Sequence, residues 1–198
     1  MLLKFIKNIK LVKRFYSSRL GKAWVQRKLS TVIPHLSQND SILDIGCGNG
    51  LVTDNLRQQN FQVTPMDVGD LSILESVKPI VYDGEHIPFE DQEFSAALLL
   101  TVLHHTDDPI AVLKETKRVA KRIVIIEDIY SNVVQKYMTY AMDTLVNLGH
   151  SNMTYQNKSD KEWKVCFEEL GLNLIHENSK SVLLFFRQAT YVVEVATT

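Results

Sequence analysis

The chain has 198 residues, of which 45% are hydrophobic and 23% are charged, with a formal net charge of −1. This length holds one α/β domain with modest additions, and the apolar content excludes an intrinsically disordered chain. No stretch approaches the roughly 18 consecutive apolar residues of a transmembrane helix. The two cysteines, Cys47 and Cys166, fit no zinc or disulfide pattern, so we expect both to be reduced.

Positive charge is concentrated at the start of the chain. Residues 1–39 contain nine basic residues and no acid, which leaves 13 basic against 23 acidic residues in the remainder. Apolar residues recur at helical spacing in 2–20, with lysines largely opposite, which predicts a basic amphipathic helix. We expect this basic N-terminal arm to cover the ligand-binding site of the following domain as a lid. The alternatives are peripheral membrane contact through residues 1–20 and a mitochondrial presequence in residues 1–16. We do not expect the protein to bind nucleic acid, because the arm lacks an aromatic stacking surface and contains no known nucleic-acid-binding module.

The next elements in chain order alternate between helical and strand patterns. A second helix is expected over 22–33, ending before Pro34. From residue 41 onward, short apolar strands alternate with helical segments, which predicts βαβ units and a mostly parallel sheet. The expected strands are 41–45, 61–66, 79–82, 95–101, 122–127, 172–178 and 182–195, the last two as an antiparallel pair. The expected helices are 50–59, 71–76, 109–120, 131–150 and 160–170, the last with a capping box.

A glycine-rich loop is the most informative segment. An apolar strand runs into a loop with glycine at every second position, and residues 42–50 have the sequence ILDIGCGNG. Such glycines let the backbone turn tightly and approach a ligand closely at the carboxyl end of a strand. A dinucleotide fingerprint would need glycine at position 51 or 53, where Leu51 and Thr53 stand, and no P-loop lysine follows. Asp44 in the strand would suit an ammonium group better than a pyrophosphate.

This pattern, apolar–Asp–apolar–G-x-G-x-G, resembles the first motif of class I S-adenosylmethionine-dependent methyltransferases. Asp67 follows 17 residues after Gly50, where the family places an acid. Residues 83–89 resemble the family's D-x-x-x-hydrophobic-P-F segment, and 98–105 resemble its fourth strand and the following loop. The resemblance covers roughly residues 38–130 and is best with ubiquinone and menaquinone biosynthesis methyltransferases. Ser95 departs from it, because the family often has aspartate there.

The resemblance implies an α/β fold: a Rossmann-like, doubly wound, mostly parallel sheet of seven strands, with helices on both faces and an antiparallel edge strand. It implies S-adenosylmethionine as cofactor, with S-adenosylhomocysteine as product. It places Asp67 at the ribose hydroxyls and Asp83 at the adenine amino group. The complete set of expected cofactor-binding residues is Asp44, Gly46, Cys47, Gly48, Gly50, Asp67, Val68, Asp83, Gly84, Glu85 and Thr101.

The candidate catalytic residues are His104 and His105, which follow the fourth strand. Either one acts as a base toward the acceptor, or both fix the loop and line the methionine moiety. No metal site is expected, since adjacent histidines on a loop rarely ligate one ion. Glu127 and Asp128 follow the fifth strand, and they either orient the acceptor or terminate the strand.

The expected domain organisation has a basic arm, 1–37, and a cofactor-binding domain, 38–198. Within this domain, 131–158 is rich in aromatics and methionines and is expected to cover the substrate. The predicted function is methyl transfer to a small, apolar or aromatic acceptor. We expect the protein to be a monomer or homodimer in the cytoplasm. It would also contact a membrane if residues 1–20 bind one, and it would be mitochondrial if residues 1–16 are a presequence. The alternative function is a non-catalytic scaffold or regulatory protein that binds S-adenosylmethionine.

Overall fold

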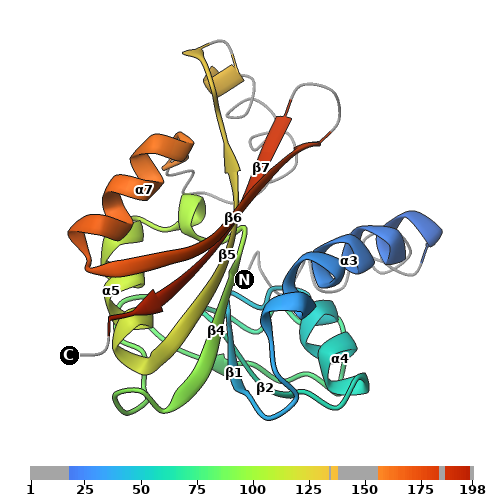
Figure 1. The fold of residues 1–198 in the computed structure, drawn as a ribbon. Helices are drawn as coiled ribbons and strands as arrows, with labels where there is room; N and C mark the ends of the chain where they lie inside the picture. Colours follow the sequence, from blue (N-terminus) through green and yellow to red (C-terminus); the bar gives the residue numbers. More distant parts are fainter. Residues whose placement is uncertain (1–17, 134, 138–155, 183–185, 197–198) are drawn as a thin grey trace.

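The computed structural model describes residues 18–133, 135–137, 156–182 and 186–196, which form a single seven-stranded sheet with flanking helices (Figure 1). The strand order is β3-β2-β1-β4-β5-β7-β6. The strands are β1 (Ser41–Ile45), β2 (Gln62–Asp67), β3 (Ile80–Val81), β4 (Phe94–Leu100), β5 (Ala120–Ile129), β6 (Leu172–Val182) and β7 (Phe186–Val195). The helices are α3 (Arg19–Val32), α4 (Leu51–Gln58), α5 (Pro109–Val119) and α7 (Asp160–Glu169), with 3-10 turns η1 (Ile33–His35) and η2 (Leu103–His105).

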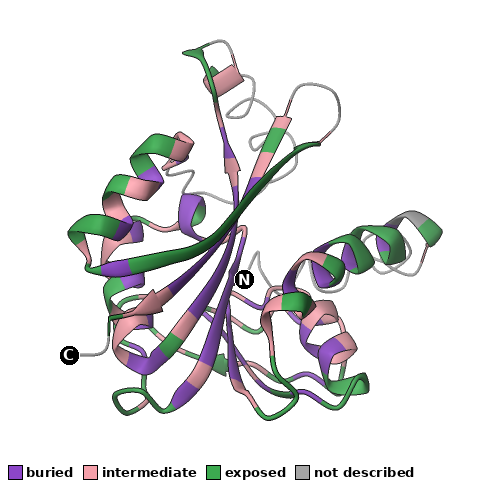
Figure 2. Ribbon diagram, in the orientation of Figure 1, coloured by how far each residue is buried: buried purple, intermediate pink, exposed green. Residues whose placement is uncertain are grey.

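The sheet is parallel from β3 to β5, and β7 runs antiparallel to both β5 and β6. This arrangement confirms the expected α/β class, the seven strands and the antiparallel edge. Parallel strands joined by crossover helices are covered on both faces, which explains why β1, β4 and β5 are apolar nearly throughout. Figure 2 shows these central strands as buried along most of their length.

Two hydrophobic layers lie on opposite faces of the sheet. On one face, α3 and α4 pack over alternate strand residues, among them Ile42, Leu98 and Val124. On the other face, α5 and α7 pack over the intervening positions, such as Leu99 and Ile125 (Figure 1). The period-two alternation of strand side chains therefore divides the core between the two helix layers.

The carboxyl ends of the parallel strands meet at one edge of the sheet. Ile45 of β1 lies opposite Met66 of β2 and Leu99 of β4, and Leu99 lies opposite Ile125 of β5. The residues that follow these positions therefore come together in space. In open α/β sheets, this edge is where ligands bind.

Most expected elements are present, but the helix expected at 71–76 is wrong. This segment forms turns instead: the Ser72 hydroxyl accepts a hydrogen bond from the Leu74 amide and donates one to its carbonyl. Such local bonds compete with helix formation. The helix expected at 22–33 begins three residues earlier, because the Ser18 hydroxyl caps it by accepting from the Gly21 amide. The capping box of α7, between Ser159 and Glu162, is confirmed.

Two of the expected segments lie largely outside the described residues. The amphipathic helix at 2–20 falls almost entirely in the undescribed start of the chain. Of the helix expected at 131–150, residues 133 and 135–137 are helical, and 138–155 are outside the described part. The lid, membrane and presequence interpretations of the arm, and the substrate-covering role of 131–158, therefore stay predictions. None of the helices within the described ranges has the length and apolarity to cross a membrane.

Candidate functional site

The glycine loop after β1 has an open side at Gly48. The backbone amides of Gly46 and Cys47 donate to the Met66 carbonyl at 2.8 and 3.1 Å, which ties the loop to β2. A Cβ added at Gly46 would lie 2.6 Å from a Val102 methyl, and one at Gly50 would lie 2.8 Å from the Ser72 hydroxyl. At Gly48 the nearest atom would be the Gly46 carbonyl oxygen, at 3.9 Å.

The three glycines of this loop all adopt positive φ angles, of 68°, 53° and 79° in chain order. Residues with a side chain rarely adopt this backbone conformation, so the loop depends on glycine for its course. Gly46 and Gly50 also leave no room for a side chain, whereas the space beside Gly48 is open. A ligand can therefore approach the backbone closely at Gly48, as the expected cofactor requires.

Asp67 holds this loop from the end of β2. One carboxylate oxygen accepts from the Gly48 amide at 2.8 Å, and the other accepts from the Val68 amide at 2.7 Å. Burial raises the pKa of Asp67, and these amide donors act in the opposite direction. A carboxylate offers about four acceptor positions, so these contacts leave capacity for a ligand hydroxyl. The structure thus gives Asp67 a loop-supporting role that the sequence did not reveal.

Asp44 lies beneath the loop, in β1. Its carboxylate is 2% exposed and accepts a hydrogen bond of 2.5 Å from the Thr53 hydroxyl of α4. Burial raises the pKa of Asp44 to about 6. The group is therefore predominantly ionised at neutral pH, and it places a negative charge close to the glycine loop.

Lys28 of α3 reaches this edge of the sheet, a contact that our sequence analysis missed. Its ammonium donates to the Leu100 carbonyl at 3.2 Å and to the Thr101 hydroxyl at 2.9 Å. Burial lowers the pKa of Lys28 to about 8, against the raising effects of Asp128 and Asp44. Lys28 entered our sequence analysis only as one of the nine basic residues of 1–39. A signal was present in the sequence, because Lys28 lies three residues after Val25 and four before Val32, both on the buried face of α3.

Thr101 is strained at the point where Lys28 binds. Its φ angle is 64°, in a region that is unusual for a β-branched residue. Such a conformation costs of order 1–3 kcal/mol and persists only where the surroundings hold it in place. Here the Thr101 amide donates to the Ile126 carbonyl at 2.6 Å, and the hydroxyl accepts from Lys28.

Glu127 of β5 and His104 of the 3-10 turn η2 form a buried pair. Glu127 is fully buried, and one of its oxygens accepts from the amides of Val102 and Leu103 at 2.9 and 2.8 Å. Its other oxygen lies 2.5 Å from Nδ1 of His104. Glu127 therefore fixes both the loop after β4 and the orientation of the imidazole. His105 is exposed, and its ring centroid lies 3.9 Å from that of His104.

Asp128 completes the acidic side of the site. Burial raises its pKa, and the Gln188 amide of β7 donates to its carboxylate at 2.9 Å. Among the described residues, no group of three or more His, Cys, Asp or Glu side chains could hold a metal ion.

The expected adenine segment lies beside the end of β2. The carboxylate of Asp83 is exposed and accepts from the amides of Glu85 and His86, both at 2.8 Å, and these donors lower its pKa. A Cβ added at Gly84 would lie 3.3 Å from a methyl of Val68, so these two expected residues are neighbours. The side chain of Arg118 anchors the following residues through the carbonyls of 87 and 89.

The structure thus gathers most of the expected residues in one region. At the carboxyl edge of β1, β2 and β4 lie Asp44, Gly46, Cys47, Gly48, Gly50, Asp67 and Thr101. Burial raises the pKa of the Cys47 thiol, which makes it a poor nucleophile. The assignment of these residues to the cofactor stays a prediction.

Comparison with known proteins gives the family. Residues 16–177, more than three quarters of the chain, match the family described as "Methyltransferase domain". A tRNA U34 carboxymethyltransferase of Nautilia profundicola is 32% identical over 102 residues, 46% of this chain and 34% of the relative. A ubiquinone biosynthesis O-methyltransferase of Nitrosospira multiformis is 25% identical over 91 residues, 40% of this chain and 38% of the relative. The chain therefore spans well under half the length of these relatives.

Solved structures agree with this fold. The magnesium protoporphyrin IX methyltransferase of Synechocystis, solved with bound S-adenosylhomocysteine, superimposes with a TM-score of 0.65. It is 13% identical, and the match covers 92% of each chain. Together with the family match, this confirms the predicted Rossmann-like fold of class I methyltransferases.

Proposed function

The chain belongs to the methyltransferase domain family, and we propose that it transfers the methyl group of S-adenosylmethionine to a small, apolar or aromatic acceptor. The observation that carries this proposal is the glycine loop, which is open at Gly48 and held there by Asp67. The open space beside Gly48 lets a ligand reach the loop backbone at this point, between the closed positions Gly46 and Gly50.

The residues of this edge would hold the cofactor in two parts. Asp67, with Val68 and Gly84 beside it, would bind the nucleoside, since a carboxylate with remaining acceptor capacity suits hydroxyl donors. Asp44 and the loop backbone would lie at the charged methionine end. When bound, S-adenosylmethionine supplies an electrophilic methyl group, and the protein then contributes mainly by holding the acceptor in line, an effect of roughly 7–11 kcal/mol.

We assign the proton transfer to His104. Glu127 accepts the Nδ1–H of the imidazole, which sets the tautomer and makes Nε2 the basic nitrogen. An acceptor hydroxyl or amine that loses a proton on methylation would pass it to Nε2. His105 is exposed, whereas His104 is buried against the Glu127 carboxylate. We prefer His104 to His105 as the base because the Glu127 carboxylate holds the His104 imidazole in one orientation.

The composition of residues 131–158 and the name of one relative support the proposed acceptor class. The aromatics and methionines of 131–158 suit an apolar acceptor, and the Nitrosospira multiformis relative is named for ubiquinone biosynthesis. The Nautilia profundicola relative is named for tRNA, so tRNA is the second acceptor that the experiment tests.

The experiment measures transfer of labelled methyl from S-adenosylmethionine to a panel of catechols and quinols and, separately, to tRNA. We expect transfer to the small aromatic panel, and a loss of about 10²–10⁴-fold in His104→Asn but a smaller one in His105→Asn. Transfer to tRNA alone would contradict the acceptor class. Cofactor binding without methyl transfer to the aromatic panel or to tRNA would favour the alternative function, a non-catalytic scaffold or regulatory protein. A larger loss in His105→Asn than in His104→Asn would overturn the assignment of the base.

A further inference from the structure

Lys28 is a buried cation at the edge of the sheet where the candidate site lies. Its ammonium, 8% exposed, lies at the carboxyl end of β4 and interacts electrostatically with Asp44 of β1 and with Glu127 and Asp128 of β5. Asp44 and Glu127 are themselves buried, and Asp128 is half-buried. Charges in such surroundings are poorly screened by salt, so each influences the others strongly.

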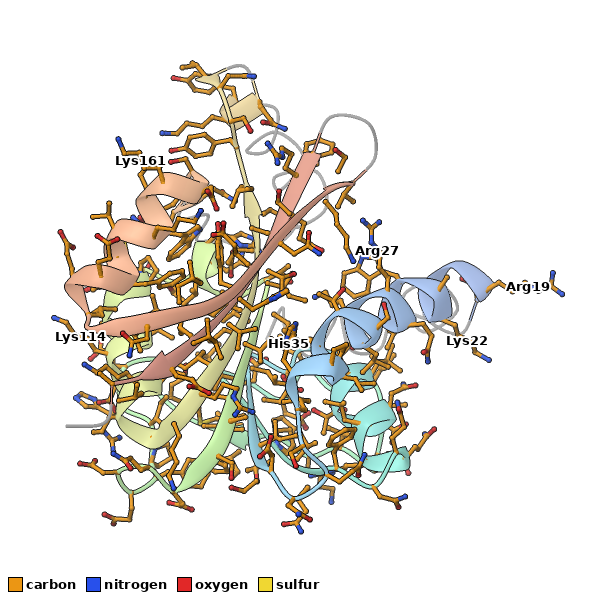
Figure 3. All side chains as sticks on the ribbon, viewed as in Figure 1. Arg19, Lys22, Arg27, His35, Lys114 and Lys161 are labelled. Atoms are coloured by element: carbon orange, nitrogen blue, oxygen red, sulfur yellow. The ribbon has the colours of Figure 1, made fainter. Side chains whose placement is uncertain are left out.

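The position of Lys28 is fixed from three sides. Its ammonium donates to the Leu100 carbonyl and the Thr101 hydroxyl. On its own helix, the ring of Trp24 lies 4.3 Å from the ammonium, one turn earlier. A lysine held in this way contributes a fixed charge, unlike Lys22, the other lysine of this helix, which is exposed (Figure 3).

We infer that Lys28 determines how strongly the site discriminates between the cationic cofactor and its neutral product. The inference rests on the proposed function. S-adenosylmethionine carries a sulfonium charge that S-adenosylhomocysteine lacks, and the two ligands are otherwise alike. The three carboxylates attract this charge and Lys28 opposes it. Lys28 thereby limits the preference for the cofactor, whereas a residue that only supports the fold would affect both ligands equally.

The expected size of this effect follows from Coulomb's law. Two unit charges about 10 Å apart, at an effective dielectric constant of about 20, interact strongly enough to change an affinity about tenfold. Lys28→Met removes the charge and keeps most of the apolar stem. We therefore expect the ratio of the dissociation constants, S-adenosylhomocysteine over S-adenosylmethionine, to rise by about tenfold in Lys28→Met.

Calorimetric titration of both ligands into the wild type, Lys28→Met and Lys28→Arg tests the inference. Lys28→Arg keeps the charge and should return the ratio toward the wild-type value. The matched control is Lys22→Met, which removes an exposed charge from the same helix and should leave the ratio unchanged. Above about pH 7, where Asp44 is already ionised, the ratio should also rise with pH in the wild type but not in Lys28→Met, because the Lys28 ammonium loses its proton near pH 8.

The outcomes separate the inference from the proposed function. If the wild type binds neither ligand, the proposed function fails. If Lys28→Met weakens both ligands equally, Lys28 either supports the fold or contacts a group that both ligands share, and the inference is overturned. If the ratio falls, the sign of the electrostatic argument is wrong and the inference is overturned as well.

Discussion

Replacing Asp44 by asparagine should make the stability of the protein less dependent on pH. Asp44 is 2% exposed, and its pKa rises from 3.8 to about 6 on burial. The folded state therefore binds this proton more strongly than the unfolded state does. The resulting contribution to stability is fully present below about pH 4 and is lost as the pH rises through about 6.

The expected magnitude follows from the two pKa values. They differ by about 2, and each pKa unit corresponds to about 1.4 kcal/mol, so the buried charge costs about 3 kcal/mol at pH 7 relative to pH 4. The side-chain amide of the Asp44→Asn variant would keep an oxygen that can accept the hydrogen bond from Thr53 and would carry no charge. The free energy of unfolding of this variant, minus that of the wild type, should therefore increase by about 3 kcal/mol between pH 4 and pH 7.

Urea unfolding at pH 4, 5, 6 and 7, followed by the fluorescence of the fully buried Trp163, measures this difference. Asp107→Asn is the matched control, because this aspartate is exposed and should give a nearly constant difference. A difference for Asp44→Asn that stays constant over this pH range would refute the reasoning, since it would mean that the carboxylate is not penalised by burial.

Three further predictions concern the loop and the buried pair. Gly46→Ala should destabilise the protein by about 1–3 kcal/mol in a thermal scan, because its Cβ would lie 2.6 Å from a Val102 methyl at positive φ. Gly48→Ala should lose less stability than Gly46→Ala but should lose most of its affinity for S-adenosylmethionine in calorimetry. Equal losses of stability in the two variants would contradict an open space beside Gly48. Glu127→Gln should cost about 1–3 kcal/mol in urea unfolding and change the pH profile of methyl transfer. An unchanged profile would show that Glu127 does not set the protonation of His104.

Much of the fold could be predicted because the signals are local. The strand ahead of the glycine loop, the apolar runs of β4 and β5, and the capping box at Ser159 each depend on residues close in sequence. The segment 71–76 was mispredicted for a local reason as well, since the turn bonds of Ser72 outcompete a helix only six residues long.

The side-chain arrangement of the site could be predicted only in part, because it depends on contacts between distant residues. Lys28 meets Thr101 across 73 positions of the chain, and Glu127 meets His104 across 23. Spacing within α3 could have placed Lys28 on the buried face of the helix, but not shown which strand end its ammonium reaches. The motif likewise marked Asp67 for the ribose without showing that it also holds the loop at Gly48.

Calorimetric titration with S-adenosylmethionine and S-adenosylhomocysteine, for the wild type beside Asp67→Ala, tests the central claim most directly. We expect micromolar dissociation constants for the wild type and affinities at least about tenfold weaker for the variant, because Asp67 both holds the loop and offers acceptors to the ligand. Absence of binding of either ligand to the wild type at millimolar concentration would contradict the proposed cofactor site.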